Sequence, residues 1–236
     1  GQPVVGDYDG DNLVDPAVYD LSSGRLYAWL SSAGYSLVTS AISFQVLPGD
    51  LPVTGDFEGD RLADPGVFNH ATGLWYIWLS SADYYRLGPL LYGLDAEDIP
   101  IPADYDGDGK TDTAVYRASA GTWYAWLSSA GYMKVGPFIF QKSLADIPVP
   151  GRFDADNLAD PAMYHQASGA WYLWPSSYGY IQLGPFIFST TEDHIAVPAD
   201  YDGDRFCDPA VYLPSLGKWR MWLSGSDYSL TEMELR

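Results

Sequence analysis

Aspartate residues recur at close, regular spacing in five short stretches of the chain. In the stretch DYDGDGKTD, residues 104–112, four aspartates occupy the first, third, fifth and ninth positions. Neighbouring carboxylates repel each other by roughly 1 kcal/mol per pair in water, and by more in less polar surroundings. A bound cation or a dense set of hydrogen-bond donors must therefore compensate these charges.

Calcium suits this spacing. It takes about 6 to 8 oxygen ligands, and a tight loop can supply carboxylates from positions 1, 3, 5 and 9 and a backbone carbonyl from position 7. We expect the third and first loops to bind best, followed by the fifth and the second. The predicted ligands are Asp7, Asp9, Asp11 and Asp15 in the first loop, Asp56, Glu58, Asp60 and Asp64 in the second, Asp104, Asp106, Asp108 and Asp112 in the third, and Asp200, Asp202, Asp204 and Asp208 in the fifth.

The fourth stretch, RFDADNLAD at 152–160, departs from the pattern. Arg152 replaces the first carboxylate and Ala155 replaces the loop glycine. A guanidinium at this place can pair with the remaining carboxylates and stand in for an ion. We therefore expect the fourth loop to hold no metal.

The sixth loop position needs a backbone that tolerates a positive φ angle. Gly109 and Asn12 suit it, whereas Arg61 and Arg205 would pay about 1 kcal/mol for adopting it. An alternative interpretation of all five loops remains open. In that interpretation they are aspartate-rich turns whose carboxylates accept backbone N–H bonds and bind nothing.

The aspartate stretches mark an internal repeat, because they recur every 48 or 49 residues and a tryptophan motif of the YAWLSS type keeps the same interval. Each copy contains four short apolar runs separated by glycine and proline, which indicates four strands and no helix. Units of this size with four strands are typical of propeller blades. The sequence predicts an all-β, five-bladed β-propeller of four-stranded antiparallel blades, a single domain over 1–236 with blades at about 1–50, 51–98, 99–146, 147–193 and 194–236.

The composition supports a packed core, since 47% of residues are hydrophobic and 16% aromatic. Strands such as TWYAWL are apolar at nearly every position, as expected where both faces of a blade are buried. We expect the repeated tryptophans to pack between blades and not to form a ligand platform. The first copy opens with its own first strand and the fifth closes with its own last strand, so no strand exchange between the chain ends is expected.

The pattern DYDGDGKTDTAVYRASAGTWYAWLSS resembles the FG-GAP or VCBS type of repeat, which is found in secreted microbial proteins and distantly in the propeller of integrin α chains. The resemblance covers all five copies. It implies an extracellular propeller with calcium loops between the first and second strands, used for adhesion, ligand binding or surface assembly, and it implies no catalysis.

Other chemistry is sparse in the sequence. Its single cysteine, Cys207, excludes an intrachain disulfide and a CxxC motif. The histidines His70, His165 and His194 occupy different places in their repeats, and we expect turn or surface positions for them. Because no catalytic motif is present and the carboxylates repeat blade by blade instead of forming one spaced pair, we predict that the chain is not an enzyme.

The acidic residues are concentrated in the loops, which hold 19 of the 31. A net charge of −19 without a basic run excludes nucleic acid as a partner, and no apolar run is long enough to span a membrane. We expect an extracellular location, and the chain is either a mature protein or part of a longer one.

Three functions remain open. The first is a calcium-binding module for adhesion or for surface or filament assembly, with a protein partner or further copies of itself. The second is a carbohydrate-binding propeller, and the third is a purely structural repeat. If the strands alternate in direction, the aspartate loops and the turns after the third strands share one face. That face would gather Tyr35, Tyr84, Tyr132, Tyr180 and Tyr228, which either contact a ligand or brace the loops.

Overall fold

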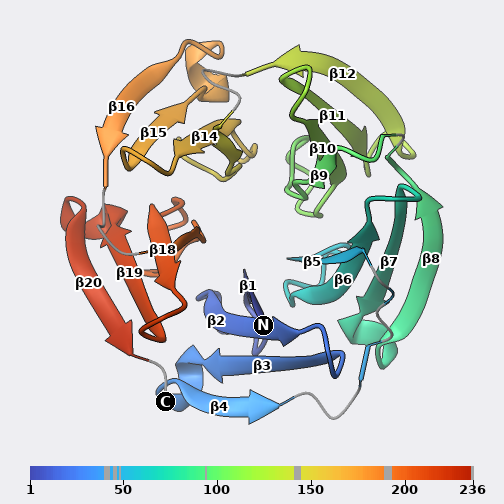
Figure 1. The fold of residues 1–236 in the computed structure, drawn as a ribbon, viewed down its shortest axis with the longest axis horizontal. Coiled ribbons are helices and arrows are strands. Elements are labelled where there is room, and N and C mark those ends of the chain that lie inside the picture. The colour runs from blue at the N-terminus through green and yellow to red at the C-terminus, as the bar shows by residue number, and fades with distance from the viewer. Residues whose placement is uncertain are drawn as a thin grey trace. The chain divides into compact units, whose positions relative to one another are not determined.

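The computed structural model describes residues 1–39, 43–44, 47, 49–93, 95–140, 145–188 and 193–234. These residues contain five four-stranded antiparallel sheets, and their helical elements are single 3-10 turns. The predicted fold class is confirmed: the chain is all-β, and its five sheets are the blades of a β-propeller (Figure 1). The last two residues of the predicted final strand, and part of each connector between blades, lie outside the described residues.

Each blade consists of four consecutive strands in sequence order, with each strand antiparallel to the next. The first blade contains β1 (Gln2–Gly6), β2 (Asp15–Asp20), β3 (Arg25–Leu30) and β4 (Ser36–Thr39). The second contains β5 (Asp50–Gly55), β6 (Asp64–Asn69), β7 (Leu74–Leu79) and β8 (Tyr85–Leu91). The third contains β9 (Asp98–Pro100), β10 (Thr113–Arg117), β11 (Thr122–Leu127) and β12 (Met133–Ile139). The fourth contains β13 (Ile147–Pro148), β14 (Ala162–His165), β15 (Ala170–Leu173) and β16 (Leu183–Ile187). The fifth contains β17 (Ile195–Ala196), β18 (Ala210–Leu213), β19 (Lys218–Leu223) and β20 (Ser229–Glu234).

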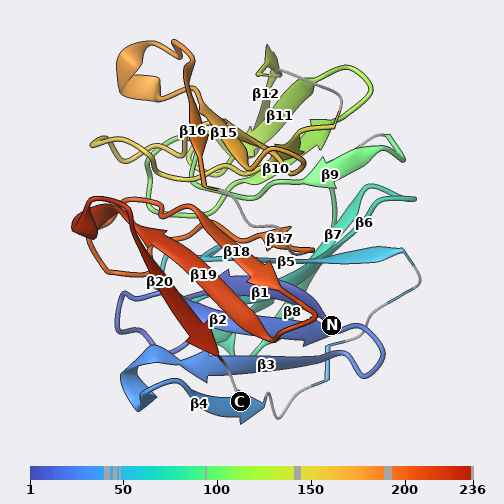
Figure 2. The same cartoon turned by 60° about the vertical axis from the view of Figure 1, so that its left-hand side comes forward.

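The chain falls into two compact units, Gly1–Ile139 and Phe140–Arg236. The first unit contains the first three blades, and the second contains the fourth and fifth (Figure 2). The organisation of 1–236 as a single domain stays a prediction.

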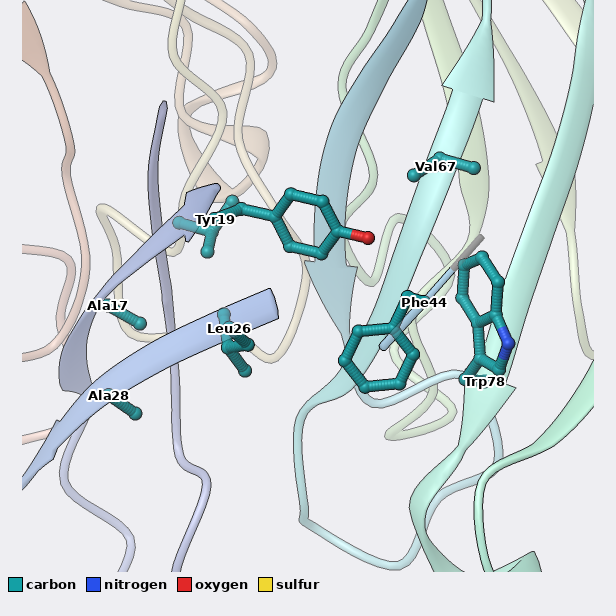
Figure 3. Close-up of a cluster of buried hydrophobic side chains, with 8 residues drawn as sticks. Ala17, Tyr19, Leu26, Ala28, Phe44, Val67 and Trp78 are labelled. Atoms are coloured by element: carbon teal, nitrogen blue, oxygen red, sulfur yellow. The ribbon is translucent and has the colours of Figure 1, made fainter. Parts of the chain in front are cut away.

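In the first unit, neighbouring blades pack through aromatic side chains. Figure 3 shows Phe44, which follows the first blade, between Tyr19 of β2 and Trp78 of β7. The ring centroids of Phe44 and Trp78 lie 5.2 Å apart, and Phe44 is 1% exposed. The cluster also contains Val67 of β6, so it joins the first two blades.

The second unit has a core of the same kind. Trp171 of β15 and Trp222 of β19 belong to one buried cluster that includes Tyr164 and Val211. Eight of the nine tryptophans are buried, in both units, as expected for side chains that pack between blades, whereas Trp29 is only partly buried. The loops therefore project from rigid, closely packed blades.

Candidate metal centre

The first three carboxylates of the third loop converge. One oxygen from each of Asp104, Asp106 and Asp108 lies within 4.8 Å of the other two. The loop bends around Asp104, whose two oxygens accept N–H bonds from Gly107 at 2.7 Å and Gly109 at 2.9 Å. Because a carboxylate oxygen has two lone pairs, such a bond leaves one for a cation. The loop can thus present several oxygens to one ion.

Three more loops contain a convergent group of the same size, defined by the same 4.8 Å limit. The second loop forms no such group among the described residues. Its longer Glu58 accepts the N–H of Ser81 at 2.7 Å, a bond that Asp106 also accepts from Ser129 in the third loop. The other groups are Asp7, Asp9 and Asp15 in the first loop, Asp154, Asp156 and Asp160 in the fourth, and Asp200, Asp202 and Asp208 in the fifth.

The fourth loop differs from the prediction in the contacts of Arg152, while its expected lack of a metal stays a prediction. Its three carboxylates converge although no metal was expected there. Arg152 forms no ion pair with a described carboxylate, and its guanidinium carbon lies 5.9 Å from the ring centroid of Phe206. Its buried Nε atom has no hydrogen-bond partner. Arg152 therefore does not take the place of a cation, because it turns towards an aromatic ring.

The ninth residue of each loop is a buried anchor. Asp112 is 0% exposed and accepts N–H bonds from Tyr105 at 2.9 Å and from Ser128 at 2.6 Å. Tyr105 lies in the loop, whereas Ser128 directly follows β11. The carboxylate therefore ties the loop to the turn between the third and fourth strands. The same pair of bonds is made by Asp15, Asp64, Asp160 and Asp208.

The charged form of these buried carboxylates is unfavourable. Burial raises the pKa of Asp112 to about 6, although the N–H bonds from Ser128 and Tyr105 oppose the shift. Burial raises the pKa of Asp64, Asp160 and Asp208 to about 6 as well. A cation beside such a carboxylate would favour its charged form.

Serine hydroxyls form part of the site, which the sequence did not predict. Ser128 Oγ donates to Asp108 at 2.8 Å, and Ser129 Oγ donates to Asp106 at 2.7 Å. Ser31 and Ser32 bond Asp11 and Asp9 in the first blade in the same way. The sequence predicted that loop and turn share a face, but not these bonds. The serine pair that follows each tryptophan strand in four of the five copies was the available signal.

The sixth loop position has the expected backbone in four loops. The φ angles are 69° at Asn12, 74° at Arg61, 87° at Gly109 and 74° at Arg205. The two arginines thus accept a conformation that disfavours a side chain. The equivalent Asn157 of the fourth loop does not have a positive φ, so this loop also differs in its backbone.

Backbone bonds connect consecutive loops within each unit. The carbonyl of Asp7 accepts the N–H of Ala63 at 2.7 Å, and the carbonyl of Asp56 accepts that of Thr111 at 2.6 Å. In the second unit, Cys207 donates to the carbonyl of Arg152 at 2.7 Å. Each bond joins the first residue of one loop to the eighth residue of the next. The loops therefore contribute to the contact between blades.

The five tyrosines of the turns share a positive φ angle, from 56° to 61°, and four of them pack against another aromatic ring. The ring of Tyr132 stacks on that of Tyr92 at a centroid distance of 5.5 Å. Tyr84, Tyr180 and Tyr228 meet Phe44, Phe140 and Phe188 in tilted pairs, at centroid distances of 5.9, 5.5 and 5.5 Å. Tyr84 and Tyr132 remain 38% exposed, Tyr180 46% and Tyr228 48%. One part of each of these four rings is thus packed and the rest is accessible.

The remaining reactive side chains are mostly structural. Cys207 is buried, and burial raises the pKa of its thiol well above the ordinary value. His194 is 5% exposed, contrary to the expected surface position, and its Nε2 lies 2.5 Å from the hydroxyl of Tyr164. Both residues belong to the packing of the second unit.

Comparison with known proteins gives a fold and no family. No family model matches the chain, and no curated protein matches it. Virginiamycin B lyase from Staphylococcus aureus is similar in structure, with a TM-score of 0.51 and 8% identity over 99% of this chain and 70% of the lyase. A catalytically inactive variant of that lyase with quinupristin gives a TM-score of 0.50, again at 8% identity over 99% of this chain and 70% of the lyase. The V. cholerae biofilm matrix protein Bap1 gives 0.36 at 17% identity, over 99% of this chain and 39% of that one.

These findings correct one prediction. The prediction that the chain is not an enzyme, which rested on missing catalytic motifs and on carboxylates that repeat blade by blade, was wrong, because a solved structure of similar fold is a lyase. At 8% identity the likeness shows the fold alone. Among the described residues, no helix is long and apolar enough to cross a bilayer.

Proposed function

We propose that this chain is a calcium-binding propeller module that acts outside the cell in adhesion or in surface or filament assembly, with a protein partner or further copies of itself. The convergence of three carboxylates in four of the five loops carries the proposal. Hard oxygen donors of this kind are the ligands that calcium prefers. We extend the proposal to the FG-GAP or VCBS type of repeat, which the aspartate spacing supports.

The residues present fit calcium. In the third loop, Asp104, Asp106 and Asp108 would contribute carboxylate oxygens, and buried Asp112 would hold the loop closed around the ion. The bound ion would compensate carboxylates that now repel one another. Exposed loops with few preformed ligands bind at about 10⁻⁴ to 10⁻³ M in extracellular modules. Calcium at that level is available outside cells, which supports the proposed location.

Carbohydrate binding is a second candidate, supported by one observation. Tyr84, Tyr132, Tyr180 and Tyr228 remain 38% to 48% exposed beside the loops, and flat rings stack on sugars. Their contacts with Phe44, Tyr92, Phe140 and Phe188 favour a bracing role. A glycan array in calcium and in chelator separates the two, since the assembly module gives a blank array.

Calorimetric titration of the chelator-treated protein with calcium tests the main proposal. We expect binding at two or more loops, and the Asp106→Ala variant should lose one site. Glu97→Ala removes an exposed carboxylate outside the loops and serves as the matched control. Absence of calcium binding in the wild-type protein, at concentrations up to several times 10⁻³ M, would refute it.

A further inference from the structure

The fourth strand of each blade is exposed, and in the first four blades it contains no acidic residue. Three of these strands, β8, β12 and β16, are long and apolar, with the sequences YRLGPLL, MKVGPFI and LGPFI. In a chain with 31 acidic residues and 12 basic ones, β8 and β12 are unusual because they combine apolar residues with Arg86 and Lys134, respectively. Exposed apolar groups of this kind mark interaction surfaces.

The edge strand β12 offers the most apolar surface of the three. Met133 is 59% exposed, Phe138 48% and Ile139 71%. Lys134 is also exposed, and its Nζ lies 4.1 Å from the ring centroid of Tyr124, which keeps the cation on the strand. β12 pairs only with β11 in its sheet, so its other edge leaves backbone donors and acceptors open (Figure 1).

The edge strand β20 has the complementary chemistry. It too is the last strand of its sheet, pairing only with β19. Glu232 and Glu234 alternate with other residues along it, and Leu230 is 52% exposed. Glu232 is bonded to Arg220 at 2.6 Å within its own blade, which leaves Glu234 as the better placed acid for an outside partner. Edge strands of opposite charge with apolar neighbours favour pairing with each other and oppose pairing with themselves.

We propose that a second copy of this chain docks edge to edge, with β20 of one copy along β12 of the other and Glu234 facing Lys134. Pro137 has no N–H and limits the backbone pairing on β12 to the segment before it, while Phe138 and Ile139 add apolar contact. The contact joins two different surfaces, so in a docked pair one copy keeps a free β12 and the other keeps a free β20, and the assembly can extend into a chain of copies. This inference rests on the proposed assembly function.

The net charge of −19 opposes association of copies, but it is not distributed evenly. The loops hold 19 of the 31 acidic residues, and β12 holds none. At physiological ionic strength exposed charges are screened beyond about 8 Å. The contact is therefore expected to be weak and to require a high protein concentration.

Analytical ultracentrifugation across the micromolar to millimolar range tests the proposal, at physiological ionic strength and in calcium. We expect concentration-dependent species larger than a dimer for the wild type. Lys134→Glu and Glu234→Lys should each weaken association about tenfold, and an equimolar mixture of the two variants should restore it. Ile139→Asn, at a side chain that is 71% exposed, should also weaken association without loss of the fold. Arg25→Glu, the same charge change at an exposed position of β3 outside the aspartate loops, is the matched control and should have no effect.

Three results would overturn the proposal. They are a wild-type monomer throughout the range, association unchanged by Glu234→Lys, and a mixture of variants that stays dissociated. Melting temperatures of the variants, close to that of the wild type, establish that they fold. Calcium titration of the same samples is a separate readout, so a protein that binds calcium but stays monomeric refutes this inference and leaves the calcium site standing.

Discussion

Replacing Asp112 by alanine should destabilise the calcium-free protein by an amount that depends on pH. In the wild type this carboxylate accepts the N–H groups of Tyr105 and Ser128 and is 0% exposed. A buried donor without a partner costs about 1–3 kcal/mol. With the carboxyl protonated, the variant should thus lose about 2–6 kcal/mol of unfolding free energy.

The ionisation of Asp112 reduces this loss as the pH rises. Its folded-state pKa is raised by burial from 3.8 to about 6, so the folded protein binds more protons than the unfolded chain between these values. Wild-type stability therefore falls with rising pH in this range. A shift of roughly two pKa units corresponds to about 3 kcal/mol. The variant lacks this group, so the destabilisation should shrink by about 2.4 kcal/mol between pH 4 and pH 7.5.

Urea unfolding of both proteins in chelator, at a series of pH values, measures this difference directly. Groups common to both proteins cancel. Asp112→Asn serves as a second variant, which should show the same trend with pH and a smaller loss because it keeps one acceptor. A difference that stays constant with pH, or that grows as the pH rises, would refute the assignment of Asp112 as a buried anchor whose charge is uncompensated.

Three further predictions concern the loops and the packing. Calcium at 100 times its dissociation constant should stabilise the fold by about 2.7 kcal/mol per site. Asp108→Ala should remove more of this gain than Asp156→Ala, because the fourth loop has Arg152 in place of its first carboxylate. Thermal melts with and without chelator measure the gain, and equal losses in the two variants would contradict the prediction. Phe44→Ala should lower the free energy of unfolding in urea by about 3–5 kcal/mol, because it removes a ring that is 1% exposed and packs between two blades. A loss below about 1 kcal/mol would show that Phe44 does not hold the two blades together. Gly109→Ala should lower the free energy of unfolding by about 1–2 kcal/mol through the φ angle of 87° alone, because a Cβ there meets no atom within 4 Å. An unchanged unfolding midpoint would show that the loop backbone relaxes.

The blades were predictable because each copy restates the same pattern. Apolar runs and glycine turns recur at the 48-residue interval, so a strand or turn that is unclear in one copy can be assigned from the equivalent residues of another. The positive φ angles of Arg61 and Arg205 could be predicted for the same reason, since Gly109 occupies the equivalent place.

Other features depend on three-dimensional contacts that no repeat interval encodes. The bond from Ser128 to Asp108 joins residues 20 positions apart. The orientation of Arg152 towards Phe206 depends on packing between the fourth and fifth blades. Whether the chain is an enzyme could not be inferred from missing motifs, because a similar fold supports a lyase.

The position of the aspartate loops gives a physical reason for their repetition. The carbonyl of Asp7 accepts the N–H of Ala63 in the next blade, and that of Asp56 accepts the N–H of Thr111. The first residue of a loop thus orients carboxylates within its own loop and supports the adjacent blade. Repulsion that opens one loop would weaken this bond, whereas a bound cation would hold it. We therefore expect calcium in one loop of the first unit to increase the protection of backbone N–H groups in the following blade. Hydrogen exchange at Ala63 and Thr111, with and without calcium, measures that protection, and exchange that is insensitive to calcium would show that the loops act independently.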